Sequence, residues 1–532
     1  MTYHMSRVAH WWANGTVAFY PTNIQRQLYS SPLAEYAILQ FFVLGGGSDR
    51  LANLVQWFCF GGSALAASRI ASRLGADRWT QWLTAFLVLT TPIAILESTS
   101  TQNDLVCAFL TAATVYFLYC EETIWTGFSL GLAILVKSTA GLVVSPFFLL
   151  LWLRQPLQPR RIFQAAAKLA AIGSIVLALN APLWLRNLHT FQNPLGYSPD
   201  VKAIASQALG FRPFIVNTIR DLSTELVTPS HRISRMEENG IRALCKVLRL
   251  NIDDPRNLSF GFPFSIGTLS ADEDVAANPI EMALLIAATI FLLALPRLRR
   301  SQPATFAIFV WAGFLLVAWR ISWQIPLARI HLPFFVLASV PVATLLREMR
   351  NRLRRTAGML AAVLALASLY PLLHNWMRPF VSIGRSKSVF TDSRADIYFA
   401  KQRREQFCYQ RTIQVLAATS CRKVGLRIRP DYDEWEYPLW ALAIENGTPM
   451  VFEYLGVENS TKNAPAGRLG APCATVAIHH PDPLAAEPAR PPWIEVQSVN
   501  AHGQETATRI ECEPGTCMRT QQNRQRPMDS SR

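Results

Sequence analysis

A polar segment between two apolar stretches is the first place where this sequence could do chemistry. The segment from Glu97 to Leu105 reads E-S-T-S-T-Q-N-D-L, and the stretches on its two sides, 79–96 and 105–120, have the composition of membrane helices. Asp104 is therefore expected where a helix re-enters the bilayer. An ionisable residue in such a position is a candidate functional site.

Two interpretations of Asp104 stay open. Its carboxylate could cap its own helix together with Asn103, because the helix dipole favours negative charge at this end. Alternatively, a polar cluster at the membrane surface could orient a hydroxyl group, bind a sugar or hold a cation. The members of this cluster would be Glu97, Gln102, Asn103 and Asp104. Glu97, considered alone, is expected to be a solvated loop residue.

The beginning of the chain holds a second group of polar residues, T-Y-H-M-S-R-V-A-H-W at residues 2–11. On a helix, Tyr3, Arg7 and His10 would share one face, with His4 beside them. That face could bind a phosphate through Arg7 and donate hydrogen bonds from the imidazole rings. The alternative is the solvated end of an interfacial helix.

Further cationic and polar residues follow in two later segments. Arg186 lies where an apolar stretch ends, although an arginine there could simply extend to the lipid headgroups. The segment W-Q-I-P-L-A-R-I-H-L-P at 323–333 supplies Gln324, Arg329 and His331. Cations in short outer loops oppose the usual charge distribution of membrane proteins, so a bound anion such as a lipid phosphate would explain them.

A divalent cation is the only cofactor that the sequence suggests. It could be held by three adjacent acids, Asp272, Glu273 and Asp274. Their alternative is a solvated loop, and no residue is assigned as a metal ligand. The sequence has no G-x-x-x-x-G-K-[ST], no G-x-G-x-x-G after a strand and no H-E-x-x-H. Nucleotide hydrolysis and zinc proteolysis therefore have no motif support.

The composition indicates a membrane protein. Of the 532 residues, 51% are hydrophobic and only 16% are charged, whereas soluble domains usually carry about 25% charged residues. The net charge of +15 suits basic cytoplasmic loops and contact with anionic lipids. No basic run alternates with aromatic residues, so nucleic acid is not an expected partner.

Apolar stretches predict an all-α polytopic membrane fold with about ten transmembrane helices. The expected spans are 51–72, 79–96, 105–120, 124–136, 139–153, 163–184, 280–296, 304–320, 331–347 and 357–373. Lys137 interrupts the fourth and fifth, and it is expected to snorkel or to pair within the bundle. Residues 31–44 are too short to span and suit an interfacial helix in a first-loop segment, 1–50.

Loop charges predict the orientation. Four arginine clusters fall on one side of the ten spans, near residues 69–78, 154–161, 297–300 and 347–355, and the positive-inside rule makes that side cytoplasmic. The outer side then receives the loop 185–279, the polar cluster at Asp104 and the end of the chain. The start of the chain would also lie outside, so a first transmembrane helix is expected to be missing from this sequence.

Beyond the transmembrane part, 51–375, the chain becomes polar. Residues 376–515 contain short β-type runs and predict a small extracytoplasmic α/β domain, followed by a disordered tail at 516–532. Five cysteines lie in this region, Cys408, Cys421, Cys473, Cys512 and Cys517. An oxidising compartment would permit disulfides among them, and because five is an odd number at least one cysteine would stay unpaired.

Taken together, the polar segments resemble the GT-C membrane glycosyltransferases of the family 39 and ArnT-like group. The matching stretches are T-Y-H-M-S-R-V-A-H-W, S-D-R-L-A-N-L-V-Q-W, S-T-Q-N-D-L, R-N-L-H-T-F-Q-N-P-L-G, W-Q-I-P-L-A-R-I-H-L-P and W-E-Y-P-L-W. They run from residue 2 to the C-terminal region in the shared order. One departure is Met5-Ser6, which replaces the usual x-Pro before Arg7.

The resemblance implies a transferase that takes a sugar from a polyprenyl-phosphate donor on the outer face of the membrane. Asp104 matches the second of two acids expected in such a site, and it is the catalytic candidate. Arg329 and His331 are candidates for contact with the lipid phosphate or the sugar. The first-loop aspartate of the family would fall just before Met1, so the base expected by resemblance is absent from the sequence as given.

We therefore predict a multi-pass glycosyltransferase of a bacterial inner membrane, with its active face and C-terminal domain extracytoplasmic. The acceptor would be a lipid, a glycan or a protein. A carboxylate would deprotonate the acceptor hydroxyl while outward arginines, Arg7, Arg186 and Arg329, stabilise the leaving phosphate. The alternatives are a transporter or flippase of a lipid-linked or anionic solute, and a catalytically inactive truncated homologue.

Overall fold

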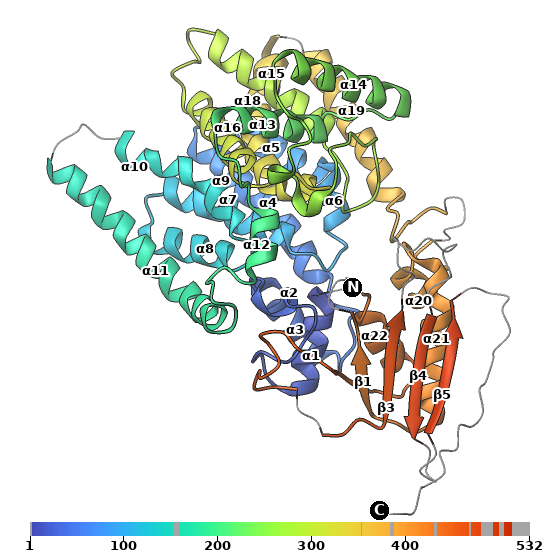
Figure 1. The fold of residues 1–532 in the computed structure, drawn as a ribbon. Coiled ribbons are helices and arrows are strands. Elements are labelled where there is room, and N and C mark those ends of the chain that lie inside the picture. Colours follow the sequence, from blue (N-terminus) through green and yellow to red (C-terminus); the bar gives the residue numbers. More distant parts are fainter. Residues whose placement is uncertain are drawn as a thin grey trace, which may run out of the picture. The chain divides into compact units, whose positions relative to one another are not determined.

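A computed structural model describes the chain as two compact units (Figure 1). It describes residues 3–153, 159–352, 354–382, 388–429, 434–467, 470–479, 493–499 and 505–512. The helical unit comprises Tyr29–Ile38 and Ala52–Arg385. The sheet unit comprises Met1–Leu28, Leu39–Leu51 and Ser386–Arg532. Helix α3 (Leu33–Leu44) belongs partly to each.

The helical unit contains helices α4 to α19 and three short 3-10 segments, η1, η2 and η3. Its first half contains α4 (Leu54–Arg73), α5 (Arg78–Thr90), α6 (Pro92–Glu97), α7 (Asp104–Tyr119), α8 (Thr123–Ile134), α9 (Thr139–Val144), η1 (Ser145–Leu149), α10 (Leu150–Leu153) and α11 (Pro159–Phe191). Its second half contains α12 (Ser198–Ile204), α13 (Phe211–Glu225), α14 (His231–Val247), η2 (Pro255–Asn257), η3 (Ser259–Gly261), α15 (Pro279–Ala294), α16 (Gln302–Arg320), α17 (Leu327–Ile330), α18 (Leu332–Arg352) and α19 (Arg354–Leu373).

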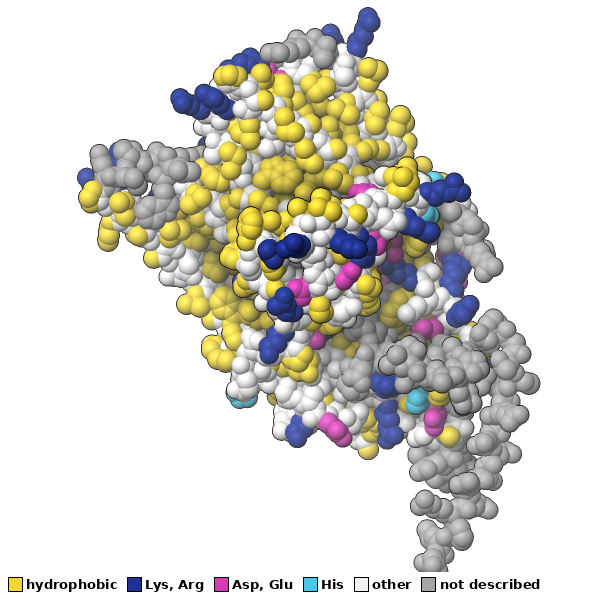
Figure 2. Space-filling model, turned by 45° about the horizontal axis from the view of Figure 1, so that its top comes forward, with side chains coloured by type: hydrophobic (Ala, Val, Ile, Leu, Met, Phe, Trp, Pro, Cys, Tyr) yellow, Lys and Arg dark blue, Asp and Glu magenta, His cyan; other side chains and the backbone are white. Residues whose placement is uncertain are grey.

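Four helices of the described part are long and apolar enough to cross a membrane: α11, α16, α18 over Leu332–Arg350, and α19. The predicted count of about ten spans is not confirmed, because many apolar helices are shorter, among them α7, α8 and α15. The surface of this unit carries large exposed apolar side chains such as Trp82 and Phe163, and Figure 2 shows hydrophobic side chains spread widely over the face in view. A surface of this kind suits contact with lipid.

Helix α18 forms the centre of the helical unit. Within the membrane-length window Leu332–Arg350, 78% of the residues are buried, and the helix packs against α5, α7, α15 and α16. Such a helix is apolar on every side because each side meets another helix. Gly313 of α16 permits a further close approach, since a Cβ there would lie 2.8 Å from the carbonyl oxygen of Val143.

The segment between α11 and α15 packs on the rest of the helical unit through a smaller apolar cluster. The buried members are Val216, Cys245, Ile252, Leu258, Phe264, Trp323 and Leu327. Trp323 closes the cluster by donating from its indole Nε1 to the hydroxyl of Thr224 at 3.0 Å. Because Leu327 belongs to α17, the cluster fixes this short helix against α13 and α14.

A five-stranded mixed sheet with the order β2-β1-β3-β4-β5 forms the centre of the sheet unit. Its strands are β1 (Lys423–Arg427), β2 (Val451–Tyr454), β3 (Ala474–His479), β4 (Trp493–Val499) and β5 (Glu505–Glu511). Strand β1 pairs in parallel with β2 and β3, whereas β3, β4 and β5 pair antiparallel. The helices of this unit are α1 (His4–Asn14), α2 (Arg26–Tyr29), α20 (Arg394–Tyr398), α21 (Arg403–Ala418) and α22 (Tyr437–Glu445). The small C-terminal sheet agrees with the predicted strands.

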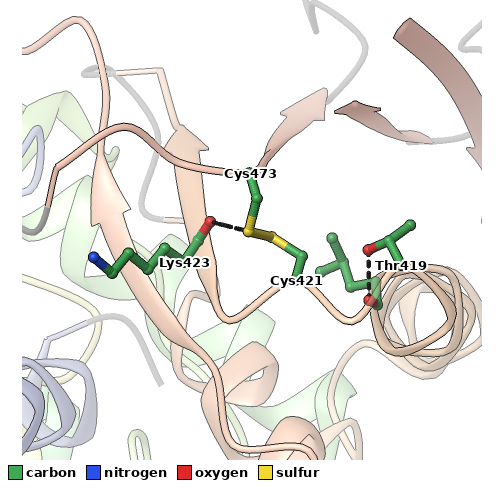
Figure 3. The surroundings of a disulfide bond; sticks show 5 residues. Thr419, Cys421, Lys423 and Cys473 are labelled. Atoms are coloured by element: carbon green, nitrogen blue, oxygen red, sulfur yellow. Dashed lines mark hydrogen bonds between the residues drawn. A yellow bond between two sulfur atoms is a disulfide. The ribbon is translucent and has the colours of Figure 1, made fainter. Parts of the chain in front are cut away.

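Two disulfides join the sheet unit. Cys408 of α21 pairs with Cys512 after β5, and Cys421 before β1 pairs with Cys473 before β3. Figure 3 shows the second disulfide beside the carbonyl oxygen of Lys423, to which the sulfur of Cys473 lies at 3.3 Å. Four of the five cysteines of the C-terminal region are therefore paired. Cys517 and the predicted tail 516–532 lie outside the described residues.

Candidate functional site

Asp104 meets two cationic side chains inside the helical unit. The side chain is only 1% exposed, and one carboxylate oxygen accepts a hydrogen bond from the ammonium group of Lys137. The other accepts from Arg329 Nε at 3.1 Å and from Arg329 Nη2 at 2.9 Å. Asn103 occupies the N-cap position of α7 but makes no capping hydrogen bond with its side chain. The pairing with cations therefore dominates the surroundings of Asp104.

Arg329 is the centre of this cluster. Besides Asp104, its guanidinium donates to Asp274 Oδ1 at 3.0 Å and to Gln102 Oε1, and its Nε lies 3.3 Å from Glu97 Oε1. The planar, always charged guanidinium group suits such a set of oxygens better than a lysine would. We call this group, Glu97, Gln102, Asp104, Lys137, Asp274 and Arg329, the Arg329 cluster.

Glu97 is buried, with 0% of its surface exposed, so the expectation of a solvated loop residue is wrong. Gln56 of α4 donates to its Oε2 at 2.8 Å. The amide oxygen of Gln56 in turn accepts from the backbone N–H groups of Leu105 at 3.0 Å and Val106 at 3.2 Å. Gln56 thus satisfies the helix N-terminus that Asn103 leaves uncapped, and it fixes Glu97 beside Arg329.

The cluster contains two cations and three carboxylates and is partly open. The side chains of Lys137, Arg329 and Asp274 are 22%, 14% and 35% exposed, respectively. Asp104 is closed to solvent, so it holds the two cations in place instead of receiving a substrate directly. Asp274 is the most accessible carboxylate of the three. This arrangement offers fixed positive charge next to an accessible proton acceptor.

Two of the three predicted cation-binding acids, Glu273 and Asp274, are engaged by arginines. Glu273 accepts from Arg378 Nη2, and Arg378 Nε donates to the hydroxyl of Thr99 at 3.3 Å. Asp274 accepts from Arg329, as described above. Within the described ranges, no group of three or more histidine, cysteine or acidic side chains is arranged to hold a metal ion.

His331 lies behind Arg329 and is 1% exposed. Its Nδ1 is 2.8 Å from Glu225 Oε1, and its Nε2 is 3.5 Å from Asp221 Oδ2. The second oxygen of Glu225 accepts from the backbone N–H and the side-chain amide of Asn278 at 3.0 and 3.1 Å. This placement fixes the turn between α17 and α18 and does not present His331 to a substrate.

The three residues predicted near the start of the chain, His4, Arg7 and His10, lie on α1 in the sheet unit and are buried. Arg7 donates to the backbone carbonyl groups of Arg26 and Gln27. His10 Nε2 lies 2.5 Å from Glu436 Oε1. Burial raises the pKa of Glu436, but the charge of His10 and hydrogen bonds from His10, Tyr454 and Trp440 outweigh it, so the pKa lies below its ordinary value.

Two other predicted residues lie away from these contacts in the chain. Arg186 is half-buried on α11, and Gln324 lies half-buried in the turn before α17. The carbonyl oxygen of Gln324 accepts from the N–H of Leu327 at 3.1 Å. The structure thus brings together Gln102, Asp104 and Arg329 from the predicted set, while Asn103 precedes Asp104 at the start of α7.

From the sequence, Lys137 and Gln56 are not assigned to the site, and Glu97 is included in the polar cluster but is expected, taken alone, to be solvated. A signal existed for Lys137, because a lysine that interrupts an apolar stretch requires a partner. Gln56 lies within S-D-R-L-A-N-L-V-Q-W, but nothing in that stretch marks it as the cap of another helix. Its role depends on the packing of α4 against α7.

A family model described as dolichyl-phosphate-mannose-protein mannosyltransferase matches residues 30–185. This segment contains Glu97, Gln102, Asp104 and Lys137. The match agrees with the predicted resemblance to membrane glycosyltransferases over this part of the chain. A comparison with curated proteins finds no match.

Several solved structures are similar to this chain at low identity. ArnT from Cupriavidus metallidurans in the apo state has 14% identity and a TM-score of 0.39, with 90% of this chain and 88% of that chain covered. The form bound to undecaprenyl phosphate has 15% identity, the same coverage and a TM-score of 0.39. The Archaeoglobus fulgidus oligosaccharyltransferase has 14% identity and a TM-score of 0.41, with 69% of this chain covered. The matched region spans 50% of the oligosaccharyltransferase chain. Similarities of this size carry no weight in assigning the reaction.

Proposed function

We propose that this chain is a membrane glycosyltransferase that moves a sugar from a polyprenyl-phosphate donor to an acceptor hydroxyl group on the outer face of a bacterial inner membrane. The observation that carries the proposal is the Arg329 cluster. In it, Lys137 and Arg329 converge on the buried carboxylate of Asp104. The family-model match over residues 30–185 supports the reaction class.

Transfer of a sugar from a phosphate leaves negative charge on the departing group. Fixed cations lower the energy of that charge in the transition state because they need no reorganisation when it develops. By pairing with Lys137 and Arg329, Asp104 holds these two cations in fixed positions before a donor binds. The ammonium group of Lys137 has three N–H donors, and its contact with Asp104 accounts for one of them.

An apolar groove of about 730 Å³ in the helical unit suits the isoprenoid chain of such a donor. Its lining includes Ser145, Pro146, Leu149, Leu315, Leu316 and Trp319. The lining comes from three segments: η1, residues 209–214 at the start of α13, and the second half of α16. Lys137 precedes the first of these segments in the chain and Arg329 follows the third, so two of the three walls adjoin a cation in sequence, which suits a lipid with an anionic head.

Asp274 is the carboxylate through which an acceptor hydroxyl group would be oriented or deprotonated. It is the most exposed acid of the cluster, and its contacts with Arg329 and Gln102 fix its position. The outer face is supported by the two disulfides of the sheet unit, because disulfides persist in oxidising compartments. The acceptor would be a lipid, a glycan or a protein.

The test is sugar transfer by the full chain in lipid nanodiscs, with polyprenyl-phosphate donors that carry labelled sugars. Release of polyprenyl phosphate and labelling of an acceptor are measured together. Asp104→Asn and Arg329→Gln are expected to lower the transfer rate about 10²- to 10³-fold, the effect of removing a fixed charge stabiliser. Glu348→Gln is the matched control, because Glu348 pairs with the exposed Arg297 at the surface.

Two outcomes would contradict the proposal. Unchanged transfer in Asp104→Asn would remove the Arg329 cluster from the reaction. Movement of intact donor across the bilayer without cleavage of the sugar–phosphate bond would instead indicate a transporter or flippase. A chelator added to the wild-type assay tests the divalent cation: lost activity that returns with Mg²⁺ or Mn²⁺ would establish a metal requirement.

A further inference from the structure

Helix α14 exposes an apolar stripe although one of its sides is packed. Ile233, Met236, Leu244 and Val247 are 52%, 72%, 50% and 79% exposed. With 3.6 residues per turn, these positions fall on one side of the helix. Four large apolar side chains in one line on a helix surface mark a contact site more strongly than scattered exposed residues do.

The other side of α14 anchors the helix to the helical unit. Cys245 is buried and Ile241 is partly buried in the apolar cluster beneath α14. Arg242 donates to Asp253 and, at 2.7 Å, to the carbonyl oxygen of Phe264. The orientation of α14 is therefore fixed, and its apolar stripe cannot turn inward.

Basic residues follow one edge of the stripe. Arg232, Arg235 and Lys246 are exposed and lie on the same side of the helix by their spacing. Among the residues that the structure describes, no acidic side chain forms an ion pair with these three. The acid nearest the stripe, Glu237, lies at its opposite edge and is half-buried. The stripe therefore borders on uncompensated positive charge.

We propose that α14 lies in the bilayer interface, with its apolar stripe among the acyl chains and its basic edge on anionic lipid headgroups. A helix with one apolar side and a basic polar side is typical of a membrane-surface helix. Basic residues next to a bilayer attract anionic lipids. This contact is separate from the Arg329 cluster and does not depend on the proposed reaction.

A second copy of the chain is a less suitable occupant of the stripe. Two copies that met through α14 would bring their basic edges close together, and like charges at an interface are unfavourable. Anionic headgroups instead complement that edge. The helix also belongs to a chain with four membrane-length helices, so a bilayer is always near.

Photocrosslinking tests this contact on the full chain in nanodiscs of phosphatidylcholine, with or without phosphatidylglycerol. The photoreactive benzoylphenylalanine replaces Met236 or Val247 in the stripe, and Gln414, which is exposed on the polar helix α21 of the sheet unit, serves as the control position. Lipid adducts detected by mass are expected at positions 236 and 247 and not at 414. Their yield is expected to rise several-fold with phosphatidylglycerol.

The remaining outcomes overturn the proposal. A covalent dimer at position 236 or 247 would assign the stripe to a second copy. Equal lipid adducts at the control position, or no adducts at any position, would remove the interfacial placement. In a variant with Arg232→Gln, Arg235→Gln and Lys246→Gln, the dependence of the yield on phosphatidylglycerol should disappear. If the dependence persists, the basic edge does not bind the headgroups.

Discussion

The ion pair between Asp104 and Lys137 gives the sharpest test of the Arg329 cluster. Asp104 is 1% exposed and Lys137 is 22% exposed, so the pair has lost much of its contact with water. Three proteins define a double-mutant cycle: Asp104→Asn, Lys137→Met and the combination of both. We expect each single change to destabilise the fold, and the combination to cost less than the sum.

The expected magnitudes follow from burial and from the partners that remain. Removing one partner of a buried pair lowers the free energy of unfolding by about 3–5 kcal/mol. Because Lys137 is partly exposed, we expect Asp104→Asn to lower it by about 3 kcal/mol. Lys137→Met leaves Asp104 with two hydrogen bonds from Arg329, so the loss of one charged hydrogen bond should cost about 2 kcal/mol. With both groups neutral no buried charge is left unpaired between them, and a coupling energy of about 2 kcal/mol is expected.

The assay is reversible unfolding of the purified chain in mixed detergent micelles by sodium dodecyl sulfate, followed by circular dichroism of the helices. The matched control cycle is the surface pair of Arg297, 56% exposed, and Glu348, for which a coupling of about 0–1 kcal/mol is expected. A coupling energy for Asp104 and Lys137 no larger than that of the surface pair would refute the reasoning, since it would mean that the cations are not held by Asp104.

Three further predictions concern residues outside the membrane-length helices. Because the pKa of Glu436 is lowered in the fold, the stability that this carboxylate contributes is complete above its ordinary pKa and is lost as the pH falls through the lowered value. Unfolding midpoints measured from pH 6 downward, within about the range where carboxylates titrate, should therefore fall more steeply in the wild type than in Glu436→Gln. Parallel curves for the two proteins would contradict this. Replacing Cys421 and Cys473 with serine opens a loop of 52 residues and should destabilise the sheet unit by about 4 kcal/mol; an unchanged denaturant midpoint would argue against that disulfide. His331→Gln should lower the rate of sugar transfer with little change in the apparent affinity for the donor, because His331 positions Arg329 without contacting substrate; loss of donor affinity alone would contradict that role.

The sequence allowed prediction of the elements and of part of the site. Local patterns define helices well, and the strands Lys423–Arg427 and Ala474–His479 follow from β-type runs in a polar region. Gln102, Asp104 and Arg329 were each predicted as site residues because polar groups at the ends of apolar helices are costly without a function. The structure brings these three side chains together in one cluster.

The burial of individual polar residues was not predictable from local patterns. Glu97 follows an apolar stretch and precedes serines and threonines, which is typical of a solvated loop, yet Gln56 from another helix bonds its carboxylate in the interior. His10 has the spacing of a ligand-binding face, but its partner Glu436 is 426 residues away in the chain. Such pairings depend on which elements of the fold pack against each other, and the sequence of a single segment does not determine that packing.

The length of helices was the other point that sequence reasoning could not fix. The stretch 124–153 was divided into two spans at Lys137, and the structure breaks it further into α8, α9, η1 and α10. The physical reason lies in the site itself. A continuous helix through this region would carry Lys137 along its own axis, whereas the break at residues 135–138 lets the side chain reach Asp104 on α7.

The Arg329 cluster draws its members from segments far apart in the chain. Asp104 and Lys137 lie 33 residues apart, whereas Arg329 lies 225 residues from Asp104. Such a cluster depends strongly on its two cations, because they already face three carboxylates and losing either one leaves more negative charge uncompensated in a poorly solvated place. The central helix α18 follows Arg329 directly, so the packing of that helix determines whether the cations reach Asp104. Substitutions that shift α18 should therefore impair the cluster, while substitutions on the exposed faces of α11 and α19, of whose membrane-length windows only 11% is buried, should leave it intact.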